Sequence, residues 1–257
     1  MSDLLQPAAG ESLDRLSLVR RVLQRRAGHR SATDDVLAAW SAWSAAPGAQ
    51  TFLDLGCGHA SVSLYLTSVL PESRGVAVEA QEVSAALARR NVLLNELQDR
   101  VWVHRADLRE LDGEVLRRLG APARFDLITG TPPFMPVGSG LLSRDPQRAA
   151  ARFELRGGIE DYCACAARLL APEGVVSMLM DGAQDERSRA AVAAAGLHLR
   201  ARLVVLPRQD RAARFIAYIA AQAPSGAVQE RTLTIRNAAG QHTGPYRDLR
   251  RALRIDP

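Results

Sequence analysis

The residues best suited to chemistry lie in two short segments. The first is Leu53–Ser61, in which Asp54, Gly56 and Gly58 form the pattern Asp-x-Gly-x-Gly at the end of an apolar run. Glycines at these positions let the backbone turn sharply after a strand and approach a ligand closely. The second is Gly130–Phe134, in which a threonine precedes two prolines and an aromatic ring. We expect the first segment to bind one ligand. We expect the second segment to form a rigid contact surface for a second ligand.

The second segment has the properties of an acceptor site for a planar group. Pro132 and Pro133 hold the preceding backbone in an extended shape, which fixes the direction of its carbonyl groups. Phe134 offers a π face, and stacking of this kind contributes about 1–3 kcal/mol per nucleic-acid base. The hydroxyl of Thr131 can accept a hydrogen bond.

Two further acids follow later apolar runs. Glu79 ends the run 75–79, and a carboxylate there can accept hydrogen bonds from both hydroxyls of a ribose. Asp107 follows the run 100–104, where it suits a ligand contact, a helix N-cap or both. A nicotinamide dinucleotide is a competing ligand for the glycine turn, because its pyrophosphate binds at a helix N-terminus. The segment Thr131–Phe134 has no place in that alternative.

The elements that must position these residues alternate between strand and helix. Strands are expected at 51–55, 75–79, 100–104, 124–129, 174–180, 197–207 and 214–221, and helices at 61–70, 81–97, 109–119, 157–170 and 185–195. The alternation predicts an α/β fold with a Rossmann-like, doubly wound sheet of seven mostly parallel strands, the last two forming an antiparallel hairpin. Ligands in such sheets bind beyond the carboxyl ends of the strands, where both chemical segments fall.

Composition limits the class of protein. The 257 residues are 47% hydrophobic and 24% charged, as in globular proteins. No apolar run is long enough to span a membrane, and residues 1–10 lack the pattern of a secretory signal, so we expect a cytoplasmic protein. Cys163 and Cys165 point to different faces of an expected helix, which disfavours a metal site or disulfide.

The net charge is +5, and every basic residue except histidine is arginine. Arginine binds phosphates through two hydrogen bonds and stacks on bases. Arginines are concentrated in 15–30 and 247–254, near the two ends of the chain. This distribution weakly favours an acidic partner such as RNA.

The two chemical segments together resemble the class I S-adenosylmethionine-dependent methyltransferases that act on nitrogen. The resemblance extends to 28–37, 146–154 and 233–246, which are similar to segments of the bacterial tRNA (valine) adenine-N6 methyltransferases. That family has Asn-Pro-Pro followed by Tyr or Phe where this chain has Thr131–Phe134, and His29 replaces a tyrosine.

The resemblance implies S-adenosylmethionine as the cofactor and assigns residues to it. The implied cofactor residues are Arg30, Asp34, Asp54, Gly56, Cys57, Gly58, Glu79, Asp107 and Thr131. The implied catalytic residues are Thr131, Pro132, Pro133 and Phe134, with Phe134, Arg152 and Glu154 binding the acceptor. In the family an amide side chain and a backbone carbonyl hold the acceptor amine while a ring stacks on the base, so catalysis rests on orientation and electrostatics.

Three regions are expected along the chain. Leucines and valines at helical spacing predict one helix over 11–26 and another over 33–45, which form an N-terminal helical extension, 1–47, capping the cofactor site. The methyltransferase domain is expected at 48–222 and a strand–helix appendage at 223–257. The segment 130–156, rich in Gly, Pro and Ser, is the expected lid of the acceptor site.

The resemblance favours N-methylation of an adenine exocyclic amine in tRNA or another RNA. Thr131, which lacks the amide of asparagine, favours two alternatives, a small molecule or a protein side chain as the acceptor. A third alternative is a catalytically silent fold that binds cofactor or RNA as a module.

Overall fold

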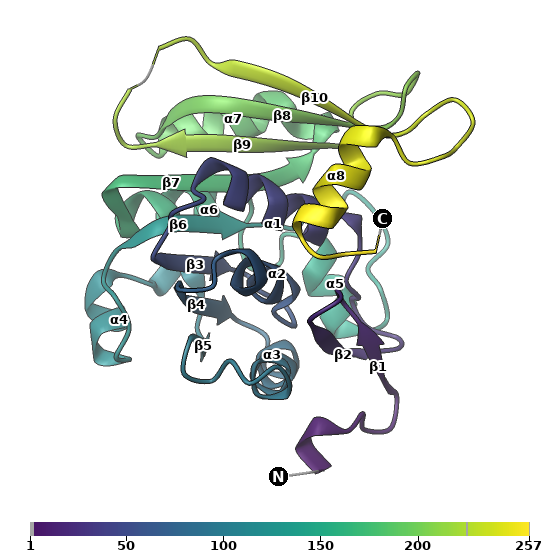
Figure 1. Ribbon diagram of the computed structural model, residues 1–257. Helices are drawn as coiled ribbons and strands as arrows, with labels where there is room; N and C mark the ends of the chain where they lie inside the picture. The colour runs from purple at the N-terminus through teal and green to yellow at the C-terminus, as the bar shows by residue number, and fades with distance from the viewer. Residues whose placement is uncertain (1–2, 225, 257) are drawn as a thin grey trace.

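The computed structural model describes residues 3–224 and 226–256. The chain forms an eight-stranded sheet with helices on both faces, and a separate two-stranded hairpin lies at the N-terminal end (Figure 1). The strands are β1 Glu11–Arg15, β2 Arg21–Arg25, β3 Thr51–Leu55, β4 Arg74–Glu79, β5 Val101–Arg105, β6 Phe125–Gly130, β7 Leu170–Asp181, β8 His198–Arg208, β9 Phe215–Ala221 and β10 Gln229–Arg236. The helices are α1 Thr33–Ala45, α2 Ser61–Val69, α3 Glu82–Leu94, α4 Gly113–Arg118, α5 Pro146–Arg152, α6 Ile159–Leu169, α7 Asp185–Ala194 and α8 Gly244–Ala252.

The sheet confirms the predicted doubly wound topology. Its strand order is β10-β8-β9-β7-β6-β3-β4-β5, and β9 runs antiparallel to both of its neighbours, β7 and β8. The neighbouring pairs from β7 to β5 are parallel. Seven strands come from the region 48–222, and the C-terminal appendage adds β10 as an eighth, parallel to β8.

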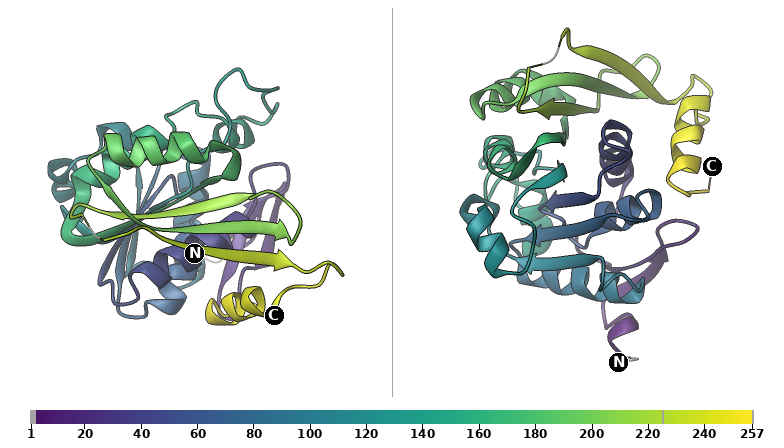
Figure 2. Two further views of the ribbon diagram at one scale, coloured as in Figure 1. Left: turned by 90° about the horizontal axis from the view of Figure 1, so that it is seen from above. Right: turned by 60° about the vertical axis from the view of Figure 1, so that its left-hand side comes forward.

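Each face of the sheet has its own apolar core. Phe52 packs on the face covered by α1, α2 and α8, whereas its neighbour Leu53 packs on the face covered by α4 and α6. This alternation is the strand period of two residues. Figure 2 shows the two helical layers with the sheet between them. Within the described residues, no helix has both the length and the apolar character needed to cross a bilayer.

The predicted helix over 11–26 is wrong, because these residues form the antiparallel hairpin β1–β2. The apolar spacing fits either structure, since Leu13 pairs with Leu23 across the hairpin. The turn leaves Leu18 and Val19 exposed, although a helix would have buried one of them with the other apolar residues. The second predicted helix, α1, is confirmed, so the N-terminal extension combines a hairpin with a single long helix.

Two other segments contain elements that the sequence did not predict. The helix expected at 109–119 is divided into a short 3₁₀ turn, Leu108–Glu110, and α4. The segment expected as a lid contains α5, whose N-terminus is capped by the side chain of Asp145. Proline at the first helical position and this cap explain why a helix begins there.

Two asparagines, Asn91 of α3 and Asn95 directly after this helix, bind the hairpin to the body of the protein. The fully buried side chain of Asn91 accepts a hydrogen bond from the backbone N–H of Leu23 (2.7 Å) and donates to the Leu23 carbonyl (3.0 Å) and the His59 carbonyl (2.9 Å). One turn later, Asn95 makes the same pair of bonds with Arg21 in a more exposed position. These amides replace the neighbouring strand that the edge of β2 lacks.

Replacing Asn91 with alanine should lower the free energy of unfolding by about 3–5 kcal/mol, because the buried polar groups of Leu23 would lose their partners. Urea denaturation would measure the loss. The matched control is Asn95→Ala, which removes the same bonds where water can replace them and should cost about 1 kcal/mol or less. Equal losses for the two variants would contradict the role assigned to Asn91.

Candidate functional site

A cavity of ≈ 930 Å³ opens beyond the carboxyl ends of β3, β4 and β6. Its lining comes from the chain between the hairpin and α1, the glycine turn after β3, the ends of β4 and β5, the segment after β6, and α5. β3 pairs with β4 on one side and β6 on the other, so Asp54 lies beside Ala77 and Thr129 in the sheet. This pairing brings the two chemical segments of the sequence to one edge.

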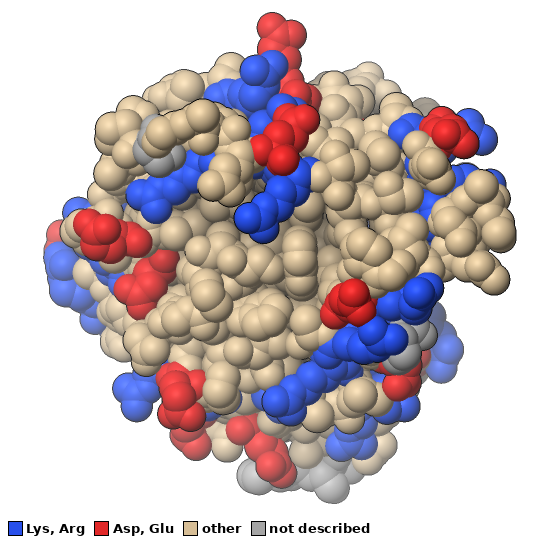
Figure 3. Space-filling view, turned by 45° about the horizontal axis from the view of Figure 1, so that its top comes forward, with Lys and Arg blue, Asp and Glu red and all other residues tan. Residues whose placement is uncertain are grey.

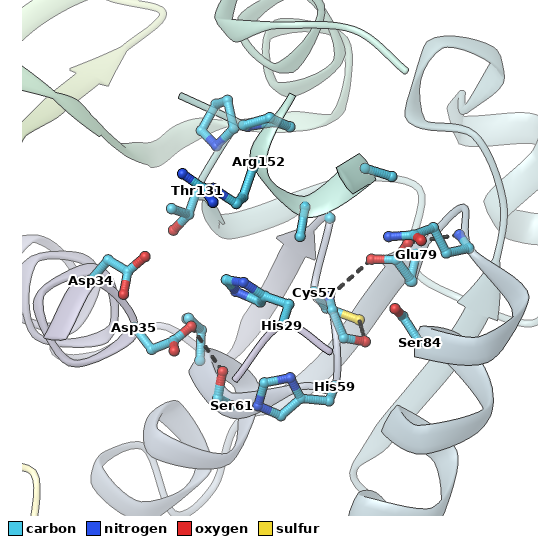
Figure 4. A pocket seen from close by; sticks show the side chains of 18 of the residues that line it. His29, Asp34, Asp35, Cys57, His59, Ser61, Glu79, Ser84, Thr131 and Arg152 are labelled. Carbon is cyan, nitrogen blue, oxygen red and sulfur yellow. Dashed lines mark hydrogen bonds between the residues drawn. The ribbon is translucent and has the colours of Figure 1, made fainter. Parts of the chain in front are cut away.

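The glycine turn has the backbone conformation that its sequence predicts. Gly56 and Gly58 have φ values of 65° and 58°, in the left-handed region that favours glycine. A Cβ atom on Gly56 would lie 2.1 Å from the hydroxyl oxygen of Tyr162, so any side chain there would displace that ring. The turn then leads directly into α2 and exposes its backbone to the cavity (Figure 4).

Asp54 is an almost fully buried acid at the cavity wall, with a relative exposure of 2%. Its Oδ2 accepts hydrogen bonds from the backbone N–H (3.2 Å) and hydroxyl (2.6 Å) of Ser63. Both bonds use Oδ2, so Oδ1 is available to a ligand. Burial raises the pKa of Asp54 to about 7, despite the bonds from Ser63. A cationic group in the cavity would favour the ionised form.

Glu79 ends β4 with its carboxylate fixed from two sides. Oε2 accepts from the backbone N–H of Gly58 (3.0 Å), and Oε1 accepts from that of Gln81 (2.7 Å). Burial raises the pKa of Glu79, while these backbone bonds act to lower it. Each oxygen keeps a second lone pair, so the carboxylate is oriented to receive two further donors.

The remaining acids and Arg30 also line the cavity. Asp107 caps the 3₁₀ turn through the N–H of Arg109 and pairs with its guanidinium, which lowers the pKa of Asp107 and keeps it ionised. Burial and the neighbouring Asp35 raise the pKa of Asp34 to about 6. Arg30 is bonded to Asp14 (3.0 Å) and Ser12 of the hairpin, so it fixes the hairpin at the cavity wall.

The acceptor side of the cavity is a supported aromatic wall. The ring of Phe134 packs against Phe215 of β9, with ring centres 5.7 Å apart. The guanidinium of Arg214 lies 5.2 Å from the centre of the Phe215 ring, and both residues also line the cavity. The buried hydroxyl oxygen of Thr131 has no hydrogen-bond partner in the described part of the chain. An unpaired buried hydroxyl at a cavity wall suits a polar group of a ligand.

A polar network outside the cavity fixes the backbone of this wall. Gln184 donates a hydrogen bond to the carbonyl of Phe134. Arg187 holds the side-chain oxygen of Gln184 (2.8 Å) and pairs with Glu154 (2.7 Å) and Glu160 (2.7 Å). Glu154 therefore contacts Arg187 and is not among the cavity-lining residues, so the structure does not bring it together with the other predicted site residues.

Sequence reasoning missed Gln184, although a signal was present. Gln184 lies three residues after the end of β7, at the same edge of the sheet as the other site residues. It also missed Gln147 of α5, which donates to Ser84 (3.0 Å) and lies against Gly28, where a Cβ atom would be 2.0 Å from its side-chain oxygen. Gln147 thus joins α5 to the hairpin side of the cavity.

The comparisons with known proteins agree with this geometry. No family model matches the chain. The tRNA1(Val) (adenine(37)-N6)-methyltransferase of Serratia proteamaculans is 28% identical over 229 residues, which cover 89% of this chain and 84% of that enzyme. An enzyme of the same name from Bacteroides thetaiotaomicron is 29% identical over 220 residues, covering 85% and 87%.

A solved structure shows the same fold. The crystal structure of a predicted O-methyltransferase from Agrobacterium tumefaciens has a TM-score of 0.60 with 17% identity, and the match covers 87% of this chain and 98% of that chain. The chain is an S-adenosylmethionine-dependent methyltransferase. The sequence-based predictions of fold, enzyme class and cofactor are thereby confirmed.

The residues of this methyltransferase fit the cofactor. S-adenosylmethionine supplies a methyl group attached to a positively charged sulfur. The buried carboxylate of Asp54 and its free oxygen suit a cationic group, and the oriented carboxylate of Glu79 suits a pair of hydroxyls. The position that a Cβ atom of Gly58 would occupy is open space, so a ligand can approach the turn closely there. All nine residues that the resemblance assigned to the cofactor line the one cavity.

In the unbound methyltransferase, the contribution of Asp54 to stability should fall as the pH rises from about 4 to about 8. The pKa of Asp54, about 7 in the fold, lies above its ordinary value of 3.8, so folding favours the protonated acid and this contribution is lost as pH passes 7. Asp54→Asn keeps an acceptor for Ser63 and removes the titration. At about pH 8 the variant should be more stable than wild type by on the order of 2–4 kcal/mol.

Urea unfolding of both proteins across this pH range would measure the difference. Asp34 and Glu79 titrate in both proteins, so their contributions cancel in the comparison. The difference should disappear near pH 4, where Asp54 is protonated in the wild type. A difference that does not change with pH would contradict the assignment.

Proposed function

We propose that this methyltransferase modifies the exocyclic amine of an adenine in tRNA, with adenine 37 of tRNA1(Val) as the first acceptor to test. The observation that carries the proposal is the continuity of one cavity from the acids and glycine turn to the aromatic wall at Phe134. The similarity to enzymes named for this modification over most of the chain supports the same acceptor. A tRNA acceptor also agrees with a cytoplasmic enzyme.

The cofactor end of the cavity is proposed to hold the two ends of S-adenosylmethionine separately. Asp54 would attract the cationic methionine end, and Glu79 would accept hydrogen bonds from the ribose hydroxyls. Asp107, kept ionised by Arg109, would accept a hydrogen bond from the adenine amino group. Arg30 and Asp34 would close this end from the side of α1.

The acceptor end is proposed to orient an amine whose lone pair is delocalised into an aromatic ring. Phe134 would stack on the base, and its ring is held in place by Phe215. The unpaired hydroxyl of Thr131 would accept a hydrogen bond from the amine and so make its nitrogen a better nucleophile for in-line attack. Pro132 and Pro133 would keep water from the reacting atoms, and Arg152 would bind RNA at the mouth of the cavity.

The charge on the surface supports an RNA partner only in a general way. Figure 3 shows one face, on which the longest band of arginines crosses the lower right and carboxylates lie beside most of the other basic groups. The net charge of +5 favours a polyanion, and arginine is suited to phosphate. The cavity therefore supports the proposed acceptor more strongly than the surface charge does.

A small molecule or a protein side chain is a second candidate acceptor. The observation that favours it is Thr131, whose short hydroxyl stands where related enzymes that act on adenine have an amide. A smaller acceptor amine could reach deeper into the wall beside Thr131 than a base stacked on Phe134.

Labelled S-adenosylmethionine should transfer its methyl group to total tRNA, and nucleoside mass analysis should identify N6-methyladenosine. Phe134→Ala should lower kcat/KM for tRNA by about 10- to 100-fold, because a stacked base loses about 1–3 kcal/mol with the ring. The conservative control Phe134→Tyr keeps the ring and should retain most of the activity. The same assay on a metabolite extract and a protein lysate tests the second candidate.

Label that appears only in the metabolite or protein pool would overturn the tRNA proposal and favour the second candidate. An unchanged rate in Phe134→Ala would leave tRNA as the acceptor and remove the stacking role. Both Phe134 variants should bind the cofactor as the wild type does, and calorimetry would measure this binding. Intact cofactor binding would show that the variants are folded.

A further inference from the structure

The most exposed large apolar side chain in the described part of the protein lies between two segments that line the cavity, Thr131–Met135 and α5. Leu141 has a relative exposure of 97%, and its neighbours Val137 and Leu142 are 64% and 54% exposed. They belong to seven consecutive exposed residues, Pro136–Leu142, which we term the apolar loop. Figure 2 (left) shows this part of the chain, in teal, extending beyond the body of the molecule. Exposed apolar groups gathered at a functional site indicate an interaction surface.

Both ends of the apolar loop are fixed to the acceptor site. Before the loop, the N–H of Met135 donates to the carbonyl of Arg152 (2.9 Å), and the carbonyl of Met135 accepts from the N–H of Glu154 (3.0 Å). After the loop, Asp145 caps α5 and pairs with Arg25 of β2 (2.8 Å). Because Met135 and α5 line the cavity, both ends of the loop have fixed positions relative to the acceptor wall.

Positive charge surrounds the apolar loop on its α5 side. Arg144, Arg148 and Arg152 are exposed, and none of them pairs with a carboxylate within residues 3–224 and 226–256. Arg148 and Arg152 also line the cavity. Unpaired cations next to apolar side chains match a partner that presents anionic groups and flat apolar faces together, which is the chemistry of phosphates and bases in an RNA loop.

We propose that the apolar loop is a wedge that packs against RNA bases adjacent to the adenine held at Phe134. This inference rests on the proposed function and names how the acceptor is presented. A base in a folded RNA loop is stacked on its neighbours and must leave them to enter the cavity. Leu141 and Leu142 would cover the base faces exposed by this movement, as apolar side chains inserted at base steps do in other complexes.

The test compares the wild type with the double variant L141S/L142S on an unmodified tRNA1(Val) transcript and on its isolated anticodon stem-loop. The control is Leu119→Ser, which removes an apolar side chain of 43% exposure at the end of α4, outside the cavity lining. The double variant should raise KM by about 10- to 100-fold with little change in kcat, as expected for the loss of two apolar contacts. Leu119→Ser should match the wild type.

Two further readouts separate a wedge from a charge effect. An anticodon stem-loop with 2-aminopurine at position 37 should become fluorescent on binding to the wild type, because its base leaves the stack, and the increase should be smaller with L141S/L142S. The slope of log affinity against log salt should be the same for both proteins, since no phosphate contact is removed. A changed slope together with an unchanged 2-aminopurine signal would overturn the wedge.

The outcomes distinguish this inference from the proposed function. If the wild type methylates tRNA and L141S/L142S has an unchanged KM, the wedge is overturned and the function stands. If the wild type neither methylates nor binds RNA, the function is overturned and the wedge with it. A third outcome is that L141S/L142S binds RNA as the wild type does but sediments as a monomer where the wild type sediments as a dimer. The apolar loop would then form a contact between two copies of the chain, and the wedge would be overturned.

Discussion

The buried amide of Asn91 joins three parts of the chain, which are α3, the N-terminal hairpin and the glycine turn. It bonds to both backbone groups of Leu23 in the hairpin and to the carbonyl of His59 in the glycine turn. A buried amide that satisfies all of its partners specifies one arrangement, because any displacement leaves polar groups without hydrogen bonds. The wall of the cavity near residues 28–30 is therefore fixed relative to the glycine turn that lines the same cavity.

Electrostatics at the cofactor end follow from this enclosure. Asp54 and Glu79 both lie at the cavity wall with raised pKa values, and burial is the main cause for each. Uncharged side chains at these two positions would not carry the free-energy cost of a buried carboxylate. In the unbound protein, ionisation of the two acids is therefore unfavourable until a cation enters the cavity. A ligand with a positive charge offsets this electrostatic cost. Part of its binding free energy therefore comes from stabilising carboxylates that are poorly solvated in the unbound protein.

Local patterns in the sequence were sufficient for the central sheet and for the place of the candidate site at its edge. The glycine turn, Glu79 and the segment Thr131–Phe134 could be placed because strand ends in a parallel sheet meet at one edge. The hairpin could not be predicted, because its apolar spacing also fits a helix and the asparagines that bind the edge of β2, Asn91 and Asn95, are distant in sequence. Glu154 was assigned to the acceptor through the family resemblance, and its pairing with Arg187, a residue of another element, could not be read from the sequence.

The hairpin also has a consequence for the order in which the protein is assembled during synthesis. It lies within the first 25 residues, yet its partners are Asn91, Asp145 and, through the bond from the N–H of Leu18, the carbonyl of Arg254. The ribosome therefore releases this segment long before the surfaces that hold it exist. A two-stranded hairpin is only marginally stable alone. The hairpin is thus made before all of these partners but is among the last segments to reach its final position, and its contact with Arg254 can form only after that residue has been made.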